Sequence, residues 1–224
     1  MRRKFDFSIG EFYHIYNRGT DKRTIFTDRN DYNRFIVLLH LCNSSEKVDI
    51  SNLVREGQSF TNLINIDVGE RLVDIGAYCL MPNHFHLLIR EKQRDGISLF
   101  MKKLLTAYSM YFNKKHKRTG SLFEGPFRGT HVDSDVYLKY LFAYIHLNPV
   151  KLINPNWKED GIQDREAAQK YLDSYEYSSY LEYSTEGKRK EARILSKSAF
   201  PEYFSNAHDF DNYINDWLSF SVAV

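Results

Sequence analysis

The stretch from Leu80 to Ile89 reads LMPNHFHLLI and places two histidines around one phenylalanine in an apolar segment. Because successive side chains of a β-strand point to opposite faces, His84 and His86 share one face and Phe85 points to the other. Two neutral imidazoles side by side are a plausible pair of metal ligands, with one or more further ligands supplied from elsewhere. The alternative is a pair of half-exposed strand histidines that hydrogen-bond to their neighbours.

A second pair of polar residues stands near the end of the segment SDVYLKYLFAYIHLNPV. Tyr144 and Asn148 are four residues apart, so in a helix they share a face, about one turn from each other. Pro149 disfavours helix at the residue before it, which places Asn148 in the last turn. A metal held by two histidines and an Asn carbonyl oxygen, with a tyrosine one turn away, would suit attack on a phosphate. The alternative is packing, because the chain has 16 tyrosines, and Tyr137 and Tyr140 lie close to the same helical face.

Basic residues are interleaved with aromatic residues between positions 96 and 118 and beside two predicted strands. This mixture suits neutralisation of a nucleic-acid backbone together with base stacking on single strands or hairpin loops. For each lysine by itself, the alternative is an ordinary solvated helix face. The candidate DNA-binding residues are Arg18, Lys102, Lys103, Lys114, Lys115, Lys117, Arg118 and Arg128.

Periodicity predicts the elements that would position these groups. Residues 11–18 alternate as a strand, residues 29–41 form an amphipathic helix, and 71–81 and 84–91 form a hairpin around Pro82 and Asn83. A helix over 96–118, a last strand within 121–132 and a helix over 134–149 follow, while residues 43–58 form a loop with one short helix. The order predicts an α+β fold of the split βαβ kind, with an antiparallel sheet that has one helix-covered face and one open face.

Four segments together resemble a known family. PNHFHLLI resembles the HUH motif of single-tyrosine HUH transposases, and AYIHLNPVK resembles the helix that bears their nucleophile. YHIYNRGTDKRTIF and GSLFEGPFRGT resemble segments of the REP-associated tyrosine transposase branch. The similarity covers roughly residues 11–152, and four segments in the same order are far more specific than any one of them.

The resemblance implies a ferredoxin-like HUH endonuclease core and a divalent metal, Mg²⁺ or Mn²⁺. It also implies a transposase that cleaves and rejoins single-stranded DNA through a 5′-phosphotyrosine intermediate. By the same resemblance, His84 and His86 would be metal ligands, Tyr144 the nucleophile and Asn148 the third ligand. Relatives in the smaller insertion-sequence branch often carry Gln at this last position.

Beyond residue 152 the chain becomes polar and rich in tyrosine, and residues 206–220 have the pattern of an amphipathic helix. We therefore expect two parts: an HUH transposase catalytic domain over 1–152 and a mostly helical C-terminal extension over 153–224. The extension either packs on the core or helps to bind single-stranded or hairpin DNA.

Composition excludes several classes of protein. The chain has 224 residues, 42% of them hydrophobic, which is enough for one sizeable core, and its net charge of +2 decides little about partners. Cys42 and Cys79 are not in a CxxC spacing, which argues against a disulfide framework or zinc ribbon. Its longest apolar run, FIVLLHLC, is too short to span a bilayer, and no signal sequence is evident. We expect a soluble cytoplasmic protein without a membrane partner, either monomer or homodimer.

Three functions are compatible with these residues. The first is the tyrosine-dependent DNA strand transferase. The second is a metal-dependent phosphodiesterase in which water attacks and Tyr144 only packs. The third is a DNA-hairpin-binding protein without catalysis, for which the loss of a histidine or of Tyr144 would be the sign; all three residues are present.

Overall fold

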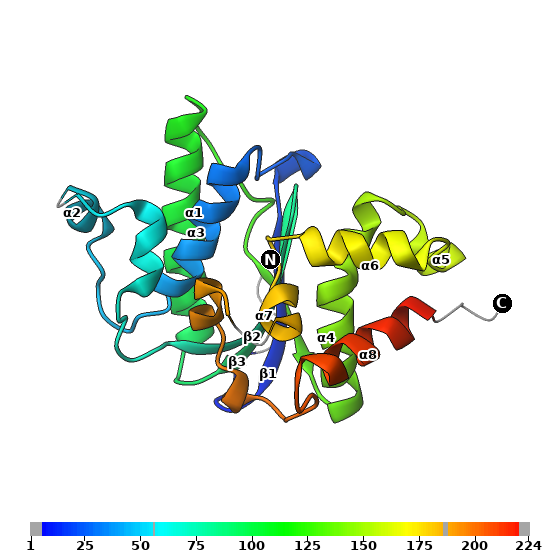
Figure 1. Ribbon diagram of the computed structural model, residues 1–224. Helices are drawn as coiled ribbons and strands as arrows, with labels where there is room; N and C mark the ends of the chain where they lie inside the picture. Colours follow the sequence, from blue (N-terminus) through cyan, green and yellow to red (C-terminus); the bar gives the residue numbers. More distant parts are fainter. Residues whose placement is uncertain (1–5, 56, 186–187, 220–224) are drawn as a thin grey trace.

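The computed structural model describes residues 6–55, 57–185 and 188–219. Its centre is an antiparallel four-stranded sheet with the strand order β2-β3-β1-β4 (Figure 1). The strands are β1 (Phe12–Arg18), β2 (Val73–Met81), β3 (His84–Glu91) and β4 (Arg128–Val132). Helix α1 (Arg29–Leu41) joins β1 to β2, and α3 (Gly96–Lys115) joins β3 to β4. This order is the predicted split βαβ arrangement, so the predicted α+β class is confirmed.

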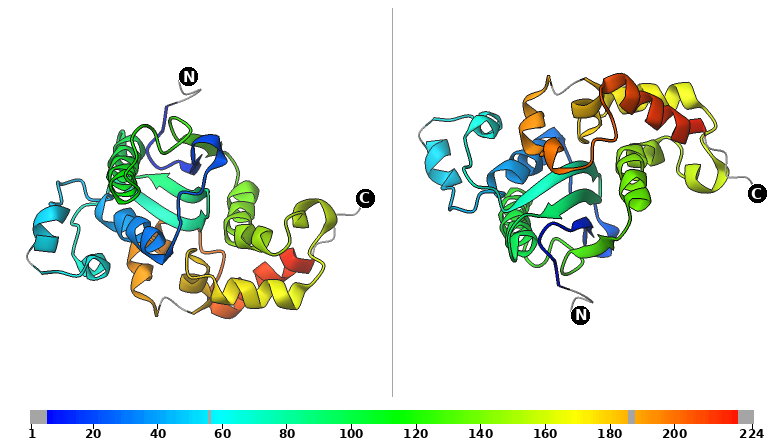
Figure 2. Two further views of the ribbon diagram at one scale, coloured as in Figure 1. Left: turned by 90° about the horizontal axis from the view of Figure 1, so that it is seen from above. Right: turned by 90° about the horizontal axis from the view of Figure 1, so that it is seen from below.

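Helices α1 and α3 cover one face of the sheet (Figure 2). The α1 helix begins after Asp28, whose carboxylate accepts hydrogen bonds from the backbone N–H groups of Asn30 and Asp31. The side chains that β3 turns toward these helices, such as Phe85 and Leu87, are fully buried in the largest apolar cluster. The helix predicted over 29–41 has the observed bounds.

The expectation of an open second face is wrong. Helix α4 (Asp135–Leu147) lies across that face, on the side opposite α1 and α3 (Figure 2). A second apolar cluster joins Ala77 and Leu88 of the sheet to Leu141 and Phe142 of the helix. The reason is visible in β2, where every residue is buried, as expected for a strand covered on both faces and not on one.

The connections depart from expectation in detail. The region after α1 contains a short helix α2 (Ile50–Arg55), as predicted, and also a 3-10 helix η2 (Phe60–Asn65). A further 3-10 helix, η1 (Thr20–Lys22), follows β1. The last strand is confined to the end of the predicted 121–132 segment, because glycine and proline interrupt its first half.

The chain beyond α4 is mostly helical. Its helices are α5 (Trp157–Asp160), α6 (Arg165–Ser174), α7 (Tyr180–Ser184) and α8 (Ala207–Ser219), with 3-10 helices η3 (Asn148–Leu152), η4 (Lys190–Ile194) and η5 (Lys197–Ala199). A third apolar cluster joins Ala143 and Leu147 of α4 to Leu172, Phe210 and Ile214 of this C-terminal part. The predicted terminal helix is present; Phe220, its predicted last residue, lies outside the described residues.

The C-terminal part also covers the edge of the sheet. The backbone N–H of Leu80 in β2 donates to the carbonyl of Tyr177, and the N–H of Ser179 donates to the carbonyl of Tyr78. These bonds pair edge groups of β2 that would otherwise be open to another chain. Within the described residues, no helix is long and apolar enough to cross a membrane.

Candidate active site

The two histidines of the HxH motif lie at the start of β3, directly after the turn at Pro82 and Asn83. The centroids of the His84 and His86 rings are 5.0 Å apart, with the rings edge to face. In the pairing with β1, His84 stands opposite Arg18 and His86 stands opposite Tyr16. Both imidazoles lie on the α4 side of the sheet, because Phe85 between them belongs to the core under α1 and α3. The shared face expected from the alternation is therefore observed.

The ring of His84 has one defined orientation. Its Nδ1 lies 2.6 Å from the side-chain oxygen of Asn83, and since that oxygen can only accept, Nδ1 carries the proton. The other nitrogen, Nε2, then has the lone pair that a metal needs. Burial, together with the positive charges of Lys151 and Arg18, lowers the pKa of His84 to about 4. The ring is thus held neutral near pH 7.

His86 is hydrogen-bonded to a third histidine. Nδ1 of His86 lies 2.9 Å from Nε2 of His14 in β1, and the two rings are stacked with centroids 5.1 Å apart. His86 is 6% exposed and His14 is 7% exposed, so water competes little for this bond. Alternation in β1 places His14 on the same face as Tyr16 and Arg18, so its position facing the site could be predicted from the sequence.

Tyr144 of α4 packs against His86 and His14. The Tyr144 ring meets both edge-on, with centroids 5.5 Å from His86 and 5.7 Å from His14. The other two tyrosines of the same helical stripe lie progressively farther from the histidines. Tyr140 stacks on Tyr144 with ring centroids 5.9 Å apart, and Tyr137 stacks on Tyr140 with centroids 6.2 Å apart. Tyr144 is thus the tyrosine of this stripe that meets the histidines.

A further tyrosine near the histidines was missed by sequence reasoning. Tyr16 of β1 has its ring centroid 5.0 Å from that of His14 and 6.1 Å from that of His86. The signal was present in the alternation of β1, which places Tyr16 between His14 and Arg18 on one face.

Burial raises the pKa of the Tyr144 phenol, and the neighbouring Tyr140 adds to this effect, whereas a hydrogen bond with Asn148 opposes it. The phenol is therefore a poor nucleophile unless charge is stabilised beside it.

Asn148 stands at the junction between α4 and η3. Its side chain is 2% exposed, and its Nδ2 donates to the backbone carbonyl of Tyr144 at 2.7 Å. Pro149 has no N–H to continue the helical ladder, which explains why the α-helix ends at Leu147 and a tighter turn follows. The amide that donates through Nδ2 keeps its carbonyl oxygen for a different partner on its other side.

The donor set fits a divalent metal. Within the described residues, no group of three His, Cys, Asp or Glu side chains could hold one. The set predicted at the HxH motif is different, because its third expected ligand, Asn148, would offer an amide oxygen. Imidazole nitrogens and an amide oxygen are ordinary ligands for Mn²⁺, and Mg²⁺ uses few protein ligands beside water and phosphate oxygens. His84, whose Nδ1 is hydrogen-bonded to Asn83, presents the nitrogen that such an ion requires.

A polar cavity of about 280 Å³ opens beside His84. Its cations are Arg18, Lys22 and Arg128, of which Arg18 is paired with Glu124. The remaining lining residues are Tyr16, Asn17, Asn83, His84, Glu124 and Pro126. Two of the sequence-predicted DNA-binding residues, Arg18 and Arg128, are therefore brought to the histidines.

The other predicted DNA-binding residues lie on or just after α3. This helix covers the sheet face opposite to the one that carries α4 and the histidines (Figure 1). Three of them have internal partners: Lys103 donates to the carbonyls of Ser44 and Glu46, Lys115 pairs with Asp28 and Asp31, and Arg118 bonds Asn113 and the carbonyl of Ser121. Side chains of Lys102, Lys114 and Lys117 are exposed. The structure does not bring these six residues to the histidines, and their DNA-binding role stays a prediction.

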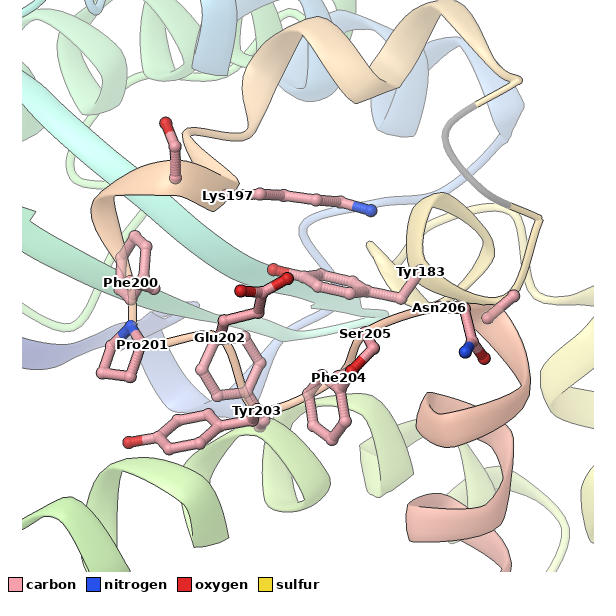
Figure 3. A pocket seen from close by; sticks show the side chains of 12 residues that line it. Tyr183, Lys197, Phe200, Pro201, Glu202, Tyr203, Phe204, Ser205 and Asn206 are labelled. Carbon is pink, nitrogen blue, oxygen red and sulfur yellow. The ribbon is translucent and has the colours of Figure 1, made fainter.

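A larger cavity of about 610 Å³ lies on another side of α4 (Figure 3). It is lined by Phe142, Tyr183, Lys197 and residues 198 and 200–207. Phe142 and Tyr144 are two residues apart in one helix, so they do not share a face. Aromatic rings dominate this cavity and the histidines do not reach it. We therefore place the candidate active site at the histidines and Tyr144.

Comparison with known proteins gives two matches. Residues 58–148 match the family described as "Transposase IS200 like", a span that contains both histidines and Tyr144 and ends at Asn148. A solved chain described as "Structure of the REP associates tyrosine transposase bound to a REP hairpin" has a TM-score of 0.48 and 13% sequence identity, covering 84% of this chain and 87% of that chain. No curated protein sequence matches the chain. The family match confirms the resemblance drawn from the HUH and nucleophile segments.

Proposed function

We propose that this chain, whose residues 58–148 match the IS200-like transposase family, cleaves and rejoins single-stranded DNA with Tyr144 as the nucleophile. One observation carries the proposal: the Tyr144 ring lies 5.5 Å from His86, which shares a strand face with His84. A phenol beside residues that could hold a divalent metal is a suitable arrangement for attack on a DNA phosphate.

His84, His86 and Asn148 would hold a divalent metal, either Mg²⁺ or Mn²⁺. When bound, such an ion polarises the scissile phosphate and offsets charge that develops on its oxygens. This matters because burial raises the pKa of Tyr144, so the phenol needs stabilised charge nearby to react. Arg18 and Arg128 line the cavity beside His84 and would hold the neighbouring backbone phosphates.

Atoms and protons balance in the transfer. The Tyr144 oxygen forms a bond to phosphorus and its proton is released, while the bond between phosphorus and the 3′ oxygen breaks and that oxygen takes up a proton. The products are a 5′-phosphotyrosine and a free 3′-hydroxyl. Because the phosphotyrosine keeps the bond energy, a 3′-hydroxyl can attack it and reseal a strand, so no nucleotide cofactor is consumed.

The test is incubation of the full chain with single-stranded and hairpin oligonucleotides, labelled at either end, in the presence of Mg²⁺ or Mn²⁺. The proposal predicts a denaturant-stable protein–DNA adduct that carries the 5′ side of the break, and a released fragment with a 3′-hydroxyl. Cleavage without an adduct would instead indicate hydrolysis by water. Binding without cleavage, under conditions that support a bound metal, would indicate a hairpin-binding protein without catalysis.

A further inference from the structure

His14 of β1 makes a hydrogen bond whose direction has a chemical consequence. Its Nε2 lies 2.9 Å from Nδ1 of His86, and both rings are almost fully buried. Two neutral imidazole nitrogens form a hydrogen bond only when one carries a proton and the other does not. The pair therefore has two possible proton arrangements, which differ in the nitrogen of His86 that carries the proton.

In the first arrangement, His86 donates its Nδ1–H to His14. The other nitrogen of His86, Nε2, then has a lone pair, and His14 carries its own proton on Nδ1. In the second arrangement, His14 donates its Nε2–H, so the proton of neutral His86 lies on Nε2. A protonated nitrogen cannot coordinate a metal, so only the first arrangement makes His86 a ligand through Nε2.

Asn83 makes a comparable hydrogen bond to Nδ1 of His84, the other proposed histidine ligand. The oxygen of the Asn83 side chain lies 2.6 Å from Nδ1 of His84 and can only accept, which leaves Nε2 of that ring deprotonated. Each histidine of the HxH motif thus has a partner on Nδ1, one from the preceding turn and one from the adjacent strand. In the first arrangement, Nε2 is the unprotonated nitrogen of both rings.

His14 also bounds the space around the nucleophile. Its ring meets Tyr144 edge-on, with centroids 5.7 Å apart, and lies 5.0 Å from the ring of Tyr16. Rotation of the His86 ring would break its bond to His14 and change its contact with Tyr144, because the three rings touch one another. One residue of β1 therefore restrains the orientation of the His86 ring on β3.

We propose that His14 is a positioning residue that holds His86 in the Nδ1–H tautomer, with Nε2 ready to coordinate a metal. The part of this inference that concerns the metal rests on the function proposed above. The choice between the two arrangements rests on it as well, because only the first makes His86 a ligand. The tautomer itself is a property of the metal-free protein and can be measured without DNA.

The first measurement is ¹⁵N NMR of the imidazole nitrogens in metal-free protein, which distinguishes the two tautomers of each ring. We expect Nδ1–H for both His84 and His86. In His14→Phe, His86 should lose this preference while His84 keeps it through Asn83. His14→Gln should restore it in part, since its side-chain oxygen can accept from Nδ1–H. His131→Phe changes a histidine on β4 that stands opposite Tyr13, on the other face of the sheet, and should change neither ring.

The second measurement is the Kd for Mn²⁺, by calorimetry or by EPR of the free ion. Loss of an outer partner of a metal-bound histidine typically weakens binding about 10- to 100-fold. We expect His14→Phe to weaken Mn²⁺ binding by this factor, His14→Gln to weaken it less, and metal-free DNA binding to stay unchanged in both.

The outcomes separate the two proposals. If the wild-type protein binds no Mn²⁺, the metal-dependent function is overturned, and the tautomer spectra still decide whether His14 orients His86. If His86 of folded His14→Phe keeps the Nδ1–H tautomer and the wild-type Mn²⁺ affinity, the role of His14 is overturned. A wild-type spectrum with the proton of His86 on Nε2 would overturn it as well.

Discussion

At the scale of single residues, burial shifts the pKa values of Tyr144 and His84 in opposite directions. Burial raises the pKa of the Tyr144 phenol and disfavours the charged form that attacks. The same burial lowers the pKa of His84 to about 4 and so keeps that imidazole neutral, the form that binds metal. The same buried environment would therefore suit the proposed metal ligands and leave the proposed nucleophile dependent on the charge of a bound metal.

The histidine ligands can be tested by substitution. His86→Ala removes one of two proposed imidazole ligands, so we expect loss of cleavage with the fold and much of the DNA affinity retained. EDTA should have the same effect on the wild-type protein. His131→Ala is the control, because it removes a histidine that bonds Glu11 away from the site. Undiminished cleavage by His86→Ala, or in EDTA, would remove the metal from the mechanism.

Asn148 should contribute less than the histidines. Asn148→Ala removes one neutral oxygen donor while two imidazoles remain, so we expect a higher Mn²⁺ requirement and residual cleavage at saturating metal. Titration of cleavage rate against Mn²⁺ measures this directly. A loss as complete as that of His86→Ala would mean that the amide also does something else, such as holding the Tyr144 turn through its bond to that carbonyl.

Glu182 in α7 makes the stability of the molecule sensitive to pH. Its side chain is 0% exposed and pairs with Arg189 at 3.2 Å, and burial raises its pKa from 4.5 to about 7. The folded state therefore binds this proton more tightly than the unfolded chain. The stability from the protonated form is present below about pH 4.5 and is lost as the pH rises through about 7.

Glu182→Gln keeps this group neutral at every pH. We expect its Tm to fall less than that of the wild type as the pH rises from about 4.5 to 7. Glu191→Gln is a suitable control, because Glu191 also contacts Arg189 but is only partly buried. Parallel Tm curves for wild type and Glu182→Gln would show that the buried carboxyl is not the source of the pH dependence.

At the scale of elements, the two groups of predicted DNA-binding cations lie on different sides of the sheet. Arg18 and Arg128 line the cavity beside His84, whereas Lys102, Lys114 and Lys117 belong to α3 and the turn after it. Lys22, which the sequence did not predict as a DNA contact, lines the same cavity as Arg128. In the proposed mechanism, only the first group lies beside the scissile phosphate, and the second group would add affinity farther along the DNA.

Combined neutralisation separates these roles. Arg128→Gln with Lys22→Gln should lower both DNA affinity and the cleavage rate of bound DNA. Neutralising Lys102, Lys114 and Lys117 together should lower the salt slope of binding by about 0.7 for each phosphate that these lysines neutralise, and leave cleavage of bound DNA unchanged. An unchanged slope in the triple variant would return these lysines to the role of a solvated helix face.

Periodicity in the sequence was sufficient to predict the helices and strands of the core. It could not predict which of these elements pack against one another. Alternation around Phe85 and helical spacing between Tyr144 and Asn148 each use neighbours in sequence, so both faces were predicted correctly. The position of α4 over the second sheet face depends on an apolar cluster that contains Leu88 of the sheet and Leu141 of the helix, which are far apart in sequence. Tyr16 was missed as a site residue for the same reason, because its contacts with His14 and His86 depend on how neighbouring elements come together.

At the scale of the whole molecule, α4 is shared by two apolar clusters. One side of it packs on the sheet through residues such as Leu141, and another side packs through Ala143 and Leu147 on the C-terminal helices. The helix that carries Tyr144 is thus held between the sheet and the C-terminal part. The division at residue 152 that the sequence suggests stays a proposal, and the packing predicts that the two parts unfold together.

Phe210→Ala tests this coupling. Phe210 of α8 is fully buried and contacts His146 of α4 through its ring. Removing a buried phenylalanine side chain typically costs about 3–5 kcal/mol. We expect a destabilisation of that size in urea, with a single transition that tryptophan fluorescence and far-UV circular dichroism report at the same midpoint. Two separate transitions would show that the C-terminal part is an independent unit.

The most direct test is to map the residue that becomes linked to DNA. Tyr144, Tyr140 and Tyr137 form one stripe on α4, but only Tyr144 has its ring against His86 and His14. Wild type, Tyr144→Phe and Tyr140→Phe are incubated with the same hairpin oligonucleotide and Mn²⁺, and any adduct is digested and identified by mass spectrometry. The proposed mechanism predicts an adduct on Tyr144 in the wild type and in Tyr140→Phe, and none in Tyr144→Phe, which should still bind metal and DNA. An adduct on Tyr140, or one that persists in Tyr144→Phe, would contradict it.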